Sequence, residues 1–125
     1  MESVASLGII VIAPATSKGW CKLKDADDLL HSLEGSKKNI NLHKALEFVD
    51  WSRTAIFGFS MGAGATIVAT ARALKEENIE RYNVKVALAS HAHWDSNTLR
   101  SRSKDITIPF MVVSGTEDKK GNIMK

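Results

Sequence analysis

The stretch that decides the fold reads Thr54-Ala-Ile-Phe-Gly-Phe-Ser-Met-Gly-Ala-Gly64. Residues 54–57 are apolar, with β-branched and aromatic side chains, which predicts a strand buried on both faces. Residues 62–75 are small or apolar on nearly every side, which predicts a buried helix packed closely on a sheet. Between them, Gly58-Phe-Ser-Met-Gly62 forms a G-x-S-x-G pattern. We therefore expect a strand, a very tight turn centred on Ser60, and a helix.

This turn has the features of a nucleophile site. The glycines leave room for a strained backbone at Ser60, which would lift its hydroxyl clear of the carboxyl edge of the sheet. The amide of Met61 and the first turn of the following helix direct positive partial charge at the space above Ser60. An oxyanion formed there would be stabilised. The alternative is a glycine-rich connection that carries a surface serine.

The composition indicates one modest domain. The chain has 125 residues, of which 44% are hydrophobic, and a net charge of +3. Its basic residues are scattered, without a basic stripe or interleaved aromatics, so no nucleic-acid partner is expected. The single cysteine, Cys21, excludes an intrachain disulfide and forms no metal motif. No apolar run reaches about 18 residues, and the start lacks the basic and cleavage signals of a secretory leader, so we expect no membrane association.

Strand and helix patterns alternate along the rest of the chain. Apolar runs predict three further strands, at residues 9–14, 82–90 and 106–115. Helical spacing predicts helices at residues 24–34, ended by Gly35, at 42–48 and onward from the turn to about 77, with a partly helical connection over 95–104. Asp50 is placed to cap the turn before the central strand. The order predicts one α/β domain, residues 1–125, with an open parallel sheet of about four strands flanked by helices.

In such a sheet, ligands bind beyond the carboxyl ends of the strands. The loops expected there follow Pro14, Phe59, Ser90 and Gly115. Reactive or aromatic residues occur in three of the four loops, namely Ser60, then His91, His93, Trp94 and Asp95, then Glu117 and Asp118. The reactive side chains are therefore expected at the same edge of the sheet where proteins of this fold class bind their ligands.

Four segments together resemble the α/β-hydrolase superfamily, and within it the dienelactone-hydrolase-like branch that includes bacterial polyester hydrolases and cutinase-like enzymes. They are Leu7-Gly-Ile-Ile-Val-Ile-Ala-Pro14, Val49-Asp50 with Arg53 to Gly64, His91-Ala-His-Trp-Asp95, and Ile108-Pro-Phe-Met-Val-Val-Ser-Gly-Thr-Glu-Asp118. The resemblance is strongest at residues 58–64 and 109–118. It implies a serine esterase that acts on a small-molecule or polymer ester and needs no metal or organic cofactor.

The resemblance also implies individual roles. Ser60 would be the nucleophile, Met61 would donate its amide to the oxyanion hole, and Asp118 would orient a histidine. Trp94 and His91 would contact the substrate. Asp118 could instead be a turn acid that bonds only its own loop, and Glu117 is the nearest rival for its catalytic role. Trp94 could instead be a partly buried aromatic residue that fills the edge of the sheet.

The triad histidine is missing from its usual place. The superfamily order is serine, acid, histidine, yet the seven residues after Asp118 contain no histidine. His31 and His43 fall on helical segments, where packing or solvent-facing roles are expected. His91 and His93 lie near strand ends close to Ser60, and His91 is an open alternative as a substitute base. The early strands that precede residue 1 in the family would also be absent, so we expect the chain to be the central portion of a longer hydrolase.

The sequence thus predicts carboxylic-ester hydrolysis through an acyl-enzyme in the intact protein. The same machinery could instead act on a dienelactone, a thioester or a small amide. The alternative from another class is a non-catalytic hydrolase-fold protein that binds a ligand, or a remnant. A third possibility is a flavodoxin-like domain with a phosphate loop at residues 15–19, for which Ala15-Thr-Ser-Lys-Gly19 is a faint candidate.

Overall fold

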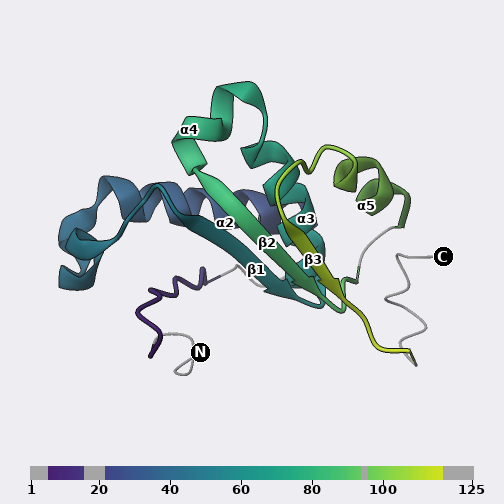
Figure 1. The fold of residues 1–125 in the computed structure, drawn as a ribbon, viewed down its shortest axis with the longest axis horizontal. Helices are drawn as coiled ribbons and strands as arrows, with labels where there is room; N and C mark the ends of the chain where they lie inside the picture. The colour runs from purple at the N-terminus through teal and green to yellow at the C-terminus, as the bar shows by residue number, and fades with distance from the viewer. Residues whose placement is uncertain (1–5, 16–21, 94–95, 117–125) are drawn as a thin grey trace.

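The computed structural model describes residues 6–15, 22–93 and 96–116. Its centre is a three-stranded parallel sheet in the order β1-β2-β3 (Figure 1). β1 spans Thr54–Phe59, β2 spans Val84–Ser90 and β3 spans Phe110–Val113. β2 pairs with β1 on one side and with β3 on the other, in parallel both times. The predicted open parallel α/β sheet is confirmed, with three strands in the described residues rather than about four.

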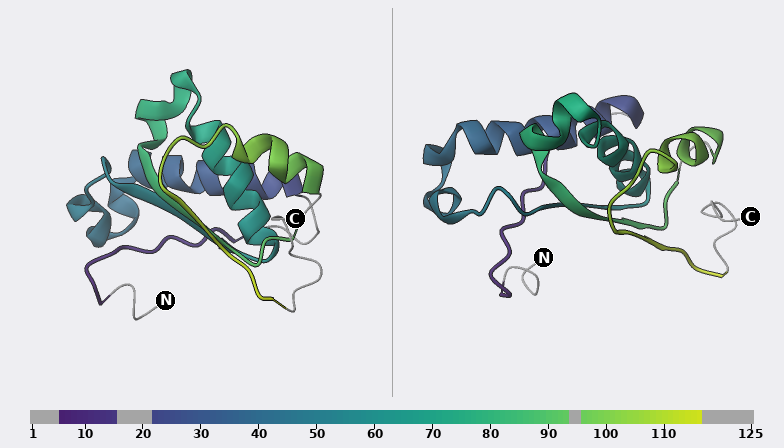
Figure 2. Two further views of the ribbon diagram at one scale, coloured as in Figure 1. Left: turned by 45° about the vertical axis from the view of Figure 1, so that its right-hand side comes forward. Right: turned by 45° about the horizontal axis from the view of Figure 1, so that its top comes forward.

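Helices precede the first strand and connect the three strands. They are α2 (Lys22–Lys38), η1 (Ile40–Leu42), η2 (Lys44–Phe48), α3 (Met61–Ala73), η3 (Glu76–Asn78), α4 (Ile79–Tyr82) and α5 (Ser96–Ser103). Because the strands follow one another across the sheet in chain order, the right-handed crossovers through α3 and α5 fall on the same face. Figure 2 shows α2, α3 and α5 together on one side of the strands.

The core lies between this helical layer and the sheet. One cluster joins α2, α3 and the beginnings of β1 and β2 through Ala26, Leu30, Ile56, Ala65, Val68, Ala69, Ala73, Tyr82 and Val84. A second joins α3 and α5 to the end of β2 through Ala63, Ile67, Ala89, Ala92 and Leu99. The many alanines let α3 approach both the sheet and α2 closely. The predicted buried helix is therefore confirmed, although it ends at Ala73 and not near residue 77.

Ion pairs fix α2 against its neighbours. Glu34 accepts hydrogen bonds from Lys38, at 2.6 Å, and from Arg81 of α4. These two bonds, from Lys38 first and Arg81 second, lower the pKa of Glu34 from 4.5 to about 2. Arg72 of α3 pairs with Asp27 of α2. The helical layer is thus held by charges at its rim as well as by its apolar core.

The other face of the sheet is bare among the described residues, so the predicted burial of the central strand on both faces is wrong. Register places Phe57, Leu88 and Met111 in one row across the three strands. Phe57 is 61% exposed and Met111 62% exposed. The alternate residues, such as Ile56 and Ala87, are buried beneath the helices. The apolar run indicated a strand correctly, but burial on both faces also needs a second covering layer.

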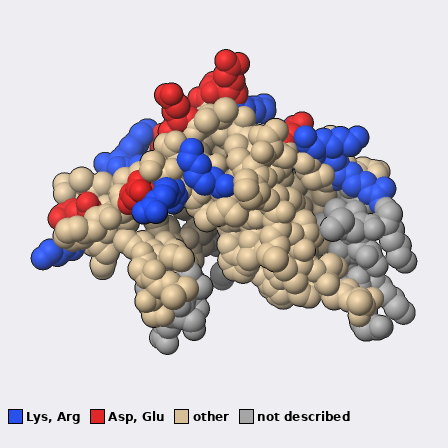
Figure 3. Space-filling view, viewed as in Figure 1, with Lys and Arg blue, Asp and Glu red and all other residues tan. Residues whose placement is uncertain are grey.

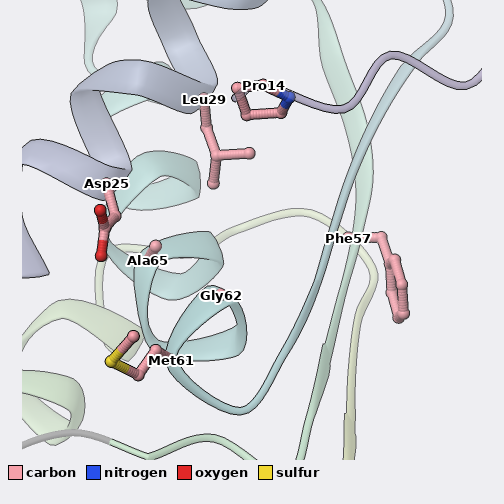
Figure 4. A pocket seen from close by; sticks show the side chains of 7 residues that line it. All are labelled: Pro14, Asp25, Leu29, Phe57, Met61, Gly62 and Ala65. Carbon is pink, nitrogen blue, oxygen red and sulfur yellow. The ribbon is translucent and has the colours of Figure 1, made fainter. Parts of the chain in front are cut away.

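The predicted strand at residues 9–14 is also wrong. Residues 9–15 carry no strand assignment, and Ile9, Ile10, Val11 and Ile12 are 39–51% exposed. A strand is stabilised by a ladder partner and by side-chain packing, and this segment has no ladder partner among the described residues. Pro14 of this segment is half-buried and lines a hollow beside Leu29 of α2 (Figure 4).

Other boundaries differ from the sequence patterns. α2 does not end at Gly35, because that glycine keeps a negative φ and the helix continues to Lys38. Ser36 supports this extension by donating its hydroxyl to the carbonyl of Ser32 at 2.8 Å. The last strand is shorter than residues 106–115 and begins after Pro109, whose carbonyl accepts from Ala87.

Local predictions around the central strand are confirmed. Asp50 caps its turn by accepting from the amide of Ser52 at 3.0 Å and from Arg53 at 2.7 Å. The helical stretch at residues 42–48 is present as η2, preceded by η1. In the part of the chain that the structure describes, no helix is both long and apolar enough to cross a membrane.

Candidate functional site

The backbone at Ser60 is strained as the sequence predicts. Its φ is 54° and its ψ is −116°, a conformation that residues with a Cβ rarely adopt. Such a conformation costs about 1–3 kcal/mol and persists only where the surroundings impose it. Although serine is a common helix N-cap, the Ser60 side chain makes no capping bond to α3. The hydroxyl of Ser60 is therefore not used as a cap of the helix that follows.

Main-chain hydrogen bonds on both sides impose this conformation. The amide of Ser60 donates to the carbonyl of Ser90 at 2.9 Å, which ties it to the end of β2. Its carbonyl accepts from Ala63 at 3.1 Å, inside α3, and from His93 at 3.0 Å. With these partners, Ser60 cannot relax without breaking the junction of β1, β2 and α3.

Gly58 is the second part of the turn. A Cβ built on Gly58 would lie 2.0 Å from the carbonyl oxygen of Gly62 and 2.5 Å from Oγ1 of Thr66. Thr66 itself donates to that carbonyl at 2.9 Å. A Cβ on Gly62 would meet no atom of the described residues within 4 Å. Of the two glycines in the pattern, only Gly58 is therefore required by the packing.

Met61 begins α3 directly after the turn. The first amides of a helix carry partial positive charge, and the main chain at Ser60 brings them beside its side chain. Met61 is half-buried at this position. The geometry is compatible with the predicted oxyanion role of its amide.

The loop after β2 reaches the same end of the sheet. The amide of His91 donates to the carbonyl of Val113 at 2.7 Å, and the amide of His93 reaches Ser60. The loop thus contacts the ends of β1 and β3 at once. This confirms that the carboxyl ends of the strands bring the serine and histidine loops together.

The two histidines of this loop differ in their surroundings. His91 has a φ of 52°, and its Nδ1 lies 2.9 Å from the hydroxyl of Ser90. Its ring lies 5.5 Å from that of Phe59, tilted by 51°. His93 is exposed. His91 is therefore held against the bare side of the sheet, where Phe59 and Ser90 share a row.

A hollow of about 240 Å³ opens beside the turn. Its lining comes from the extended N-terminal segment, α2, β1 and the first turns of α3, through Pro14, Asp25, Leu29, Phe57, Met61, Gly62 and Ala65 (Figure 4). Leu29 points into it, whereas the ring of Phe57 projects away from the helices. Among the described residues that line it, Asp25 supplies the only charged group and the others are apolar.

Two residues of the predicted site, Trp94 and Asp118, lie outside the described residues, as does Glu117. His31 is exposed on α2. His43 caps η2, its Nδ1 accepting from the amide of Ala45 at 3.1 Å. Within residues 6–15, 22–93 and 96–116, no group of three or more His, Cys, Asp or Glu side chains is arranged to hold a metal ion.

Sequence reasoning missed two parts of this region. The bond from His93 to Ser60 runs through the main chain, so no residue type announces it. Asp25 and Leu29 were predicted to lie on a helix, but their place beside Met61 depends on how α2 packs on α3.

Comparison with known proteins adds nothing to this geometry: no family model, no curated protein and no solved structure matches the chain.

Proposed function

We propose that the chain carries the nucleophile turn of a serine-dependent carboxylic ester hydrolase of the α/β-hydrolase type, with Ser60 as the nucleophile. The observation that supports this most directly is the strained φ of 54° at Ser60, at the end of a parallel strand and the start of a helix. A connection with no chemical role gains nothing from a conformation that costs about 1–3 kcal/mol.

The reaction follows from the position of the hydroxyl. Oγ of Ser60 attacks the ester carbonyl carbon as a histidine takes its proton, and the amide of Met61 stabilises the oxyanion. The carbon–oxygen bond to the alcohol then breaks, and the alcohol leaves with that proton. Water attacks the acyl-enzyme, releases the acid and restores the Ser60 hydroxyl. By resemblance, Asp118 orients the histidine, and Trp94 and His91 contact a small-molecule or polymer ester.

The source of the base decides how the proposal is tested. By resemblance, the histidine would follow Asp118, and the sequence has none there. The chain assayed by itself should therefore show no appreciable turnover of p-nitrophenyl acetate. Imidazole in solution can supply a base. With imidazole present, hydrolysis by the wild type should exceed that by Ser60→Ala, whose rate gives the background.

A covalent probe gives an independent readout. A fluorophosphonate should label Ser60 faster than any other serine, as located by mass spectrometry of the peptides. Ser103→Ala is the control, because Ser103 ends α5 and donates its hydroxyl to the carbonyl of Arg100, and its loss should not change the labelling rate at Ser60. Equal imidazole-dependent rates for the wild type and Ser60→Ala, together with no preferential labelling of Ser60, would reject the proposal.

The apolar hollow favours a second candidate, a non-catalytic protein that binds an apolar ligand. Its lining includes Met61 and Ala65. In this case benzyl acetate should shift the methyl NMR signals of Met61 and Ala65, while that of Met111 on the sheet face stays unchanged. Binding at the hollow without any Ser60-dependent chemistry would favour this candidate over the hydrolase.

A further inference from the structure

The bare face of the sheet is an ordered apolar surface. It consists of Phe57 and Phe59 on β1, Val86 and Leu88 on β2, and Met111 and Val113 on β3, and we call it the open face. Register aligns these residues in rows, so that Phe57, Leu88 and Met111 form one row. In the next row, the polar residue Ser90 lies between Phe59 and Val113.

The exposure of the open face is large for these residue types. Phe57, Phe59 and Met111 are 61%, 63% and 62% exposed, and Val86 and Val113 are 44% and 39% exposed. In Figure 3, charged side chains gather over the helices and around the edges, whereas the middle of the surface is tan. A contiguous apolar surface on parallel strands marks a place where another layer packs.

We infer that the open face is the interface of a two-fold homodimer, with a second copy of this chain as its occupant. The central row of the face is lowest in the middle. Leu88 of β2 is half-buried, whereas Phe57 and Met111 on either side of it are 61% and 62% exposed. In an isologous pair of aligned sheets, the outer side chains of one copy can fill the trough over β2 of the other.

The area agrees with this occupant. At the observed exposures, the five most exposed side chains offer on the order of 500 Å² per copy. Two copies would then bury on the order of 1,000 Å² in total, the lower limit of a specific interface. No charged side chain belongs to the open face, so pairing two copies leaves no buried charge. The inference does not rest on the proposed ester hydrolysis, because the open face does not include Ser60; His91, whose ring centroid lies 5.5 Å from that of Phe59, borders this face.

The test is sedimentation velocity of the purified full chain over a wide range of concentration. The wild type should form a discrete dimer. Met111→Glu should weaken it at least tenfold, because each dimer would contain two buried charges. Phe48→Glu is the matched control: Phe48 is 78% exposed on η2, away from the sheet, and its substitution should leave the dimer within twofold of the wild type.

Circular dichroism and urea unfolding of each variant exclude loss of the fold as the cause. Val86→Lys gives a second substitution within the open face, with the same expected loss. A monomer at every concentration would overturn the inference and leave the open face to another occupant. So would aggregates without a fixed stoichiometry, a dimer unaffected by both substitutions on the open face, or equal weakening by Phe48→Glu.

Discussion

Gly58 of β1 and Gly62 of α3 approach so closely that a Cβ on Gly58 would lie 2.0 Å from the carbonyl oxygen of Gly62. This approach brings the strand and helix together at Ser60. The two glycines of the pattern therefore differ in what the packing requires, since a Cβ at Gly62 would meet no atom of the described residues.

The first prediction is that Gly58→Ala is strongly destabilising. The added methyl must displace main-chain atoms of α3, and overpacking of this kind costs about 1–3 kcal/mol or more. Urea unfolding should show the loss as a lower midpoint. Gly35→Ala is the control, because Gly35 lies inside α2 with nothing within 4 Å. That substitution should stabilise the protein by about 0.5–1 kcal/mol. Equal effects at the two sites would contradict the packing described for the turn.

The second prediction concerns two buried threonines on α3. Oγ1 of Thr70 is buried and has no hydrogen-bond partner among the described residues, whereas Oγ1 of Thr66 donates to the carbonyl of Gly62. Thr70→Val should therefore stabilise the protein by about 1 kcal/mol, because it removes an unsatisfied polar group without changing the volume. Thr66→Val should be neutral or destabilising. Thermal unfolding of the pair measures both, and a stabilisation at Thr66 equal to that at Thr70 would contradict the assignment.

The third prediction is that Ser60→Gly stabilises the fold. Glycine adopts a φ of 54° without strain, so about 1 kcal/mol should remain after the entropy that glycine adds to the unfolded chain. Ser90→Gly is the control, because Ser90 lies in β2 and glycine weakens a strand. Urea midpoints should move in opposite directions for the two variants. A loss of stability at Ser60→Gly would show that the serine side chain outweighs its own strain.

The fourth prediction follows from the lowered pKa of Glu34, which is about 2 in the folded chain against an ordinary 4.5. Above pH 4.5 the carboxylate is ionised in both states, and its bonds to Lys38 and Arg81 contribute fully. Between pH 4.5 and about 2 the unfolded chain binds a proton that the native chain does not, so stability falls as the pH falls. Glu34→Gln should flatten the pH dependence of the urea midpoint over this interval.

Glu76→Gln, on the exposed η3, is the control for that experiment. It should leave the slope of stability against pH unchanged. Asp50, whose pKa is lowered chiefly by the hydroxyl of Ser52, contributes in the same direction and keeps part of the slope in both variants. An undiminished slope in Glu34→Gln would show that its ion pairs do not stabilise the folded chain.

Features that depend on a few adjacent residues were predictable from the sequence. The pairing of a strand and the layer that covers a sheet face were not. The strain at Ser60 and the cap at Asp50 were predicted correctly because each depends on a few adjacent residues. The apolar run at Ile9–Ile12 indicated a strand, but an apolar run carries no information about which edge it would pair with. Phe57 likewise belongs to a strand as predicted, while its exposure depends on a layer that the strand does not encode.

Gly35 and His93 illustrate two further limits. Glycine ends a helix when its φ is positive, and residue type alone does not reveal that φ. Among the glycines of the described residues, Gly8 has a positive φ and Gly35 does not. His93 reaches Ser60 through an amide that any residue other than proline would supply. The resemblance to hydrolases named candidate roles at Ser60, Met61 and His91, and those roles remain predictions.

The strand order of the sheet bears on how the chain folds during synthesis. β1, β2 and β3 are neighbours in space in the same sequence in which the ribosome releases them. Each strand can dock on the one made just before it, with the intervening helix closing the connection. Among the described residues, each strand after β1 finds its neighbour already made, so the sheet can assemble in the order of synthesis.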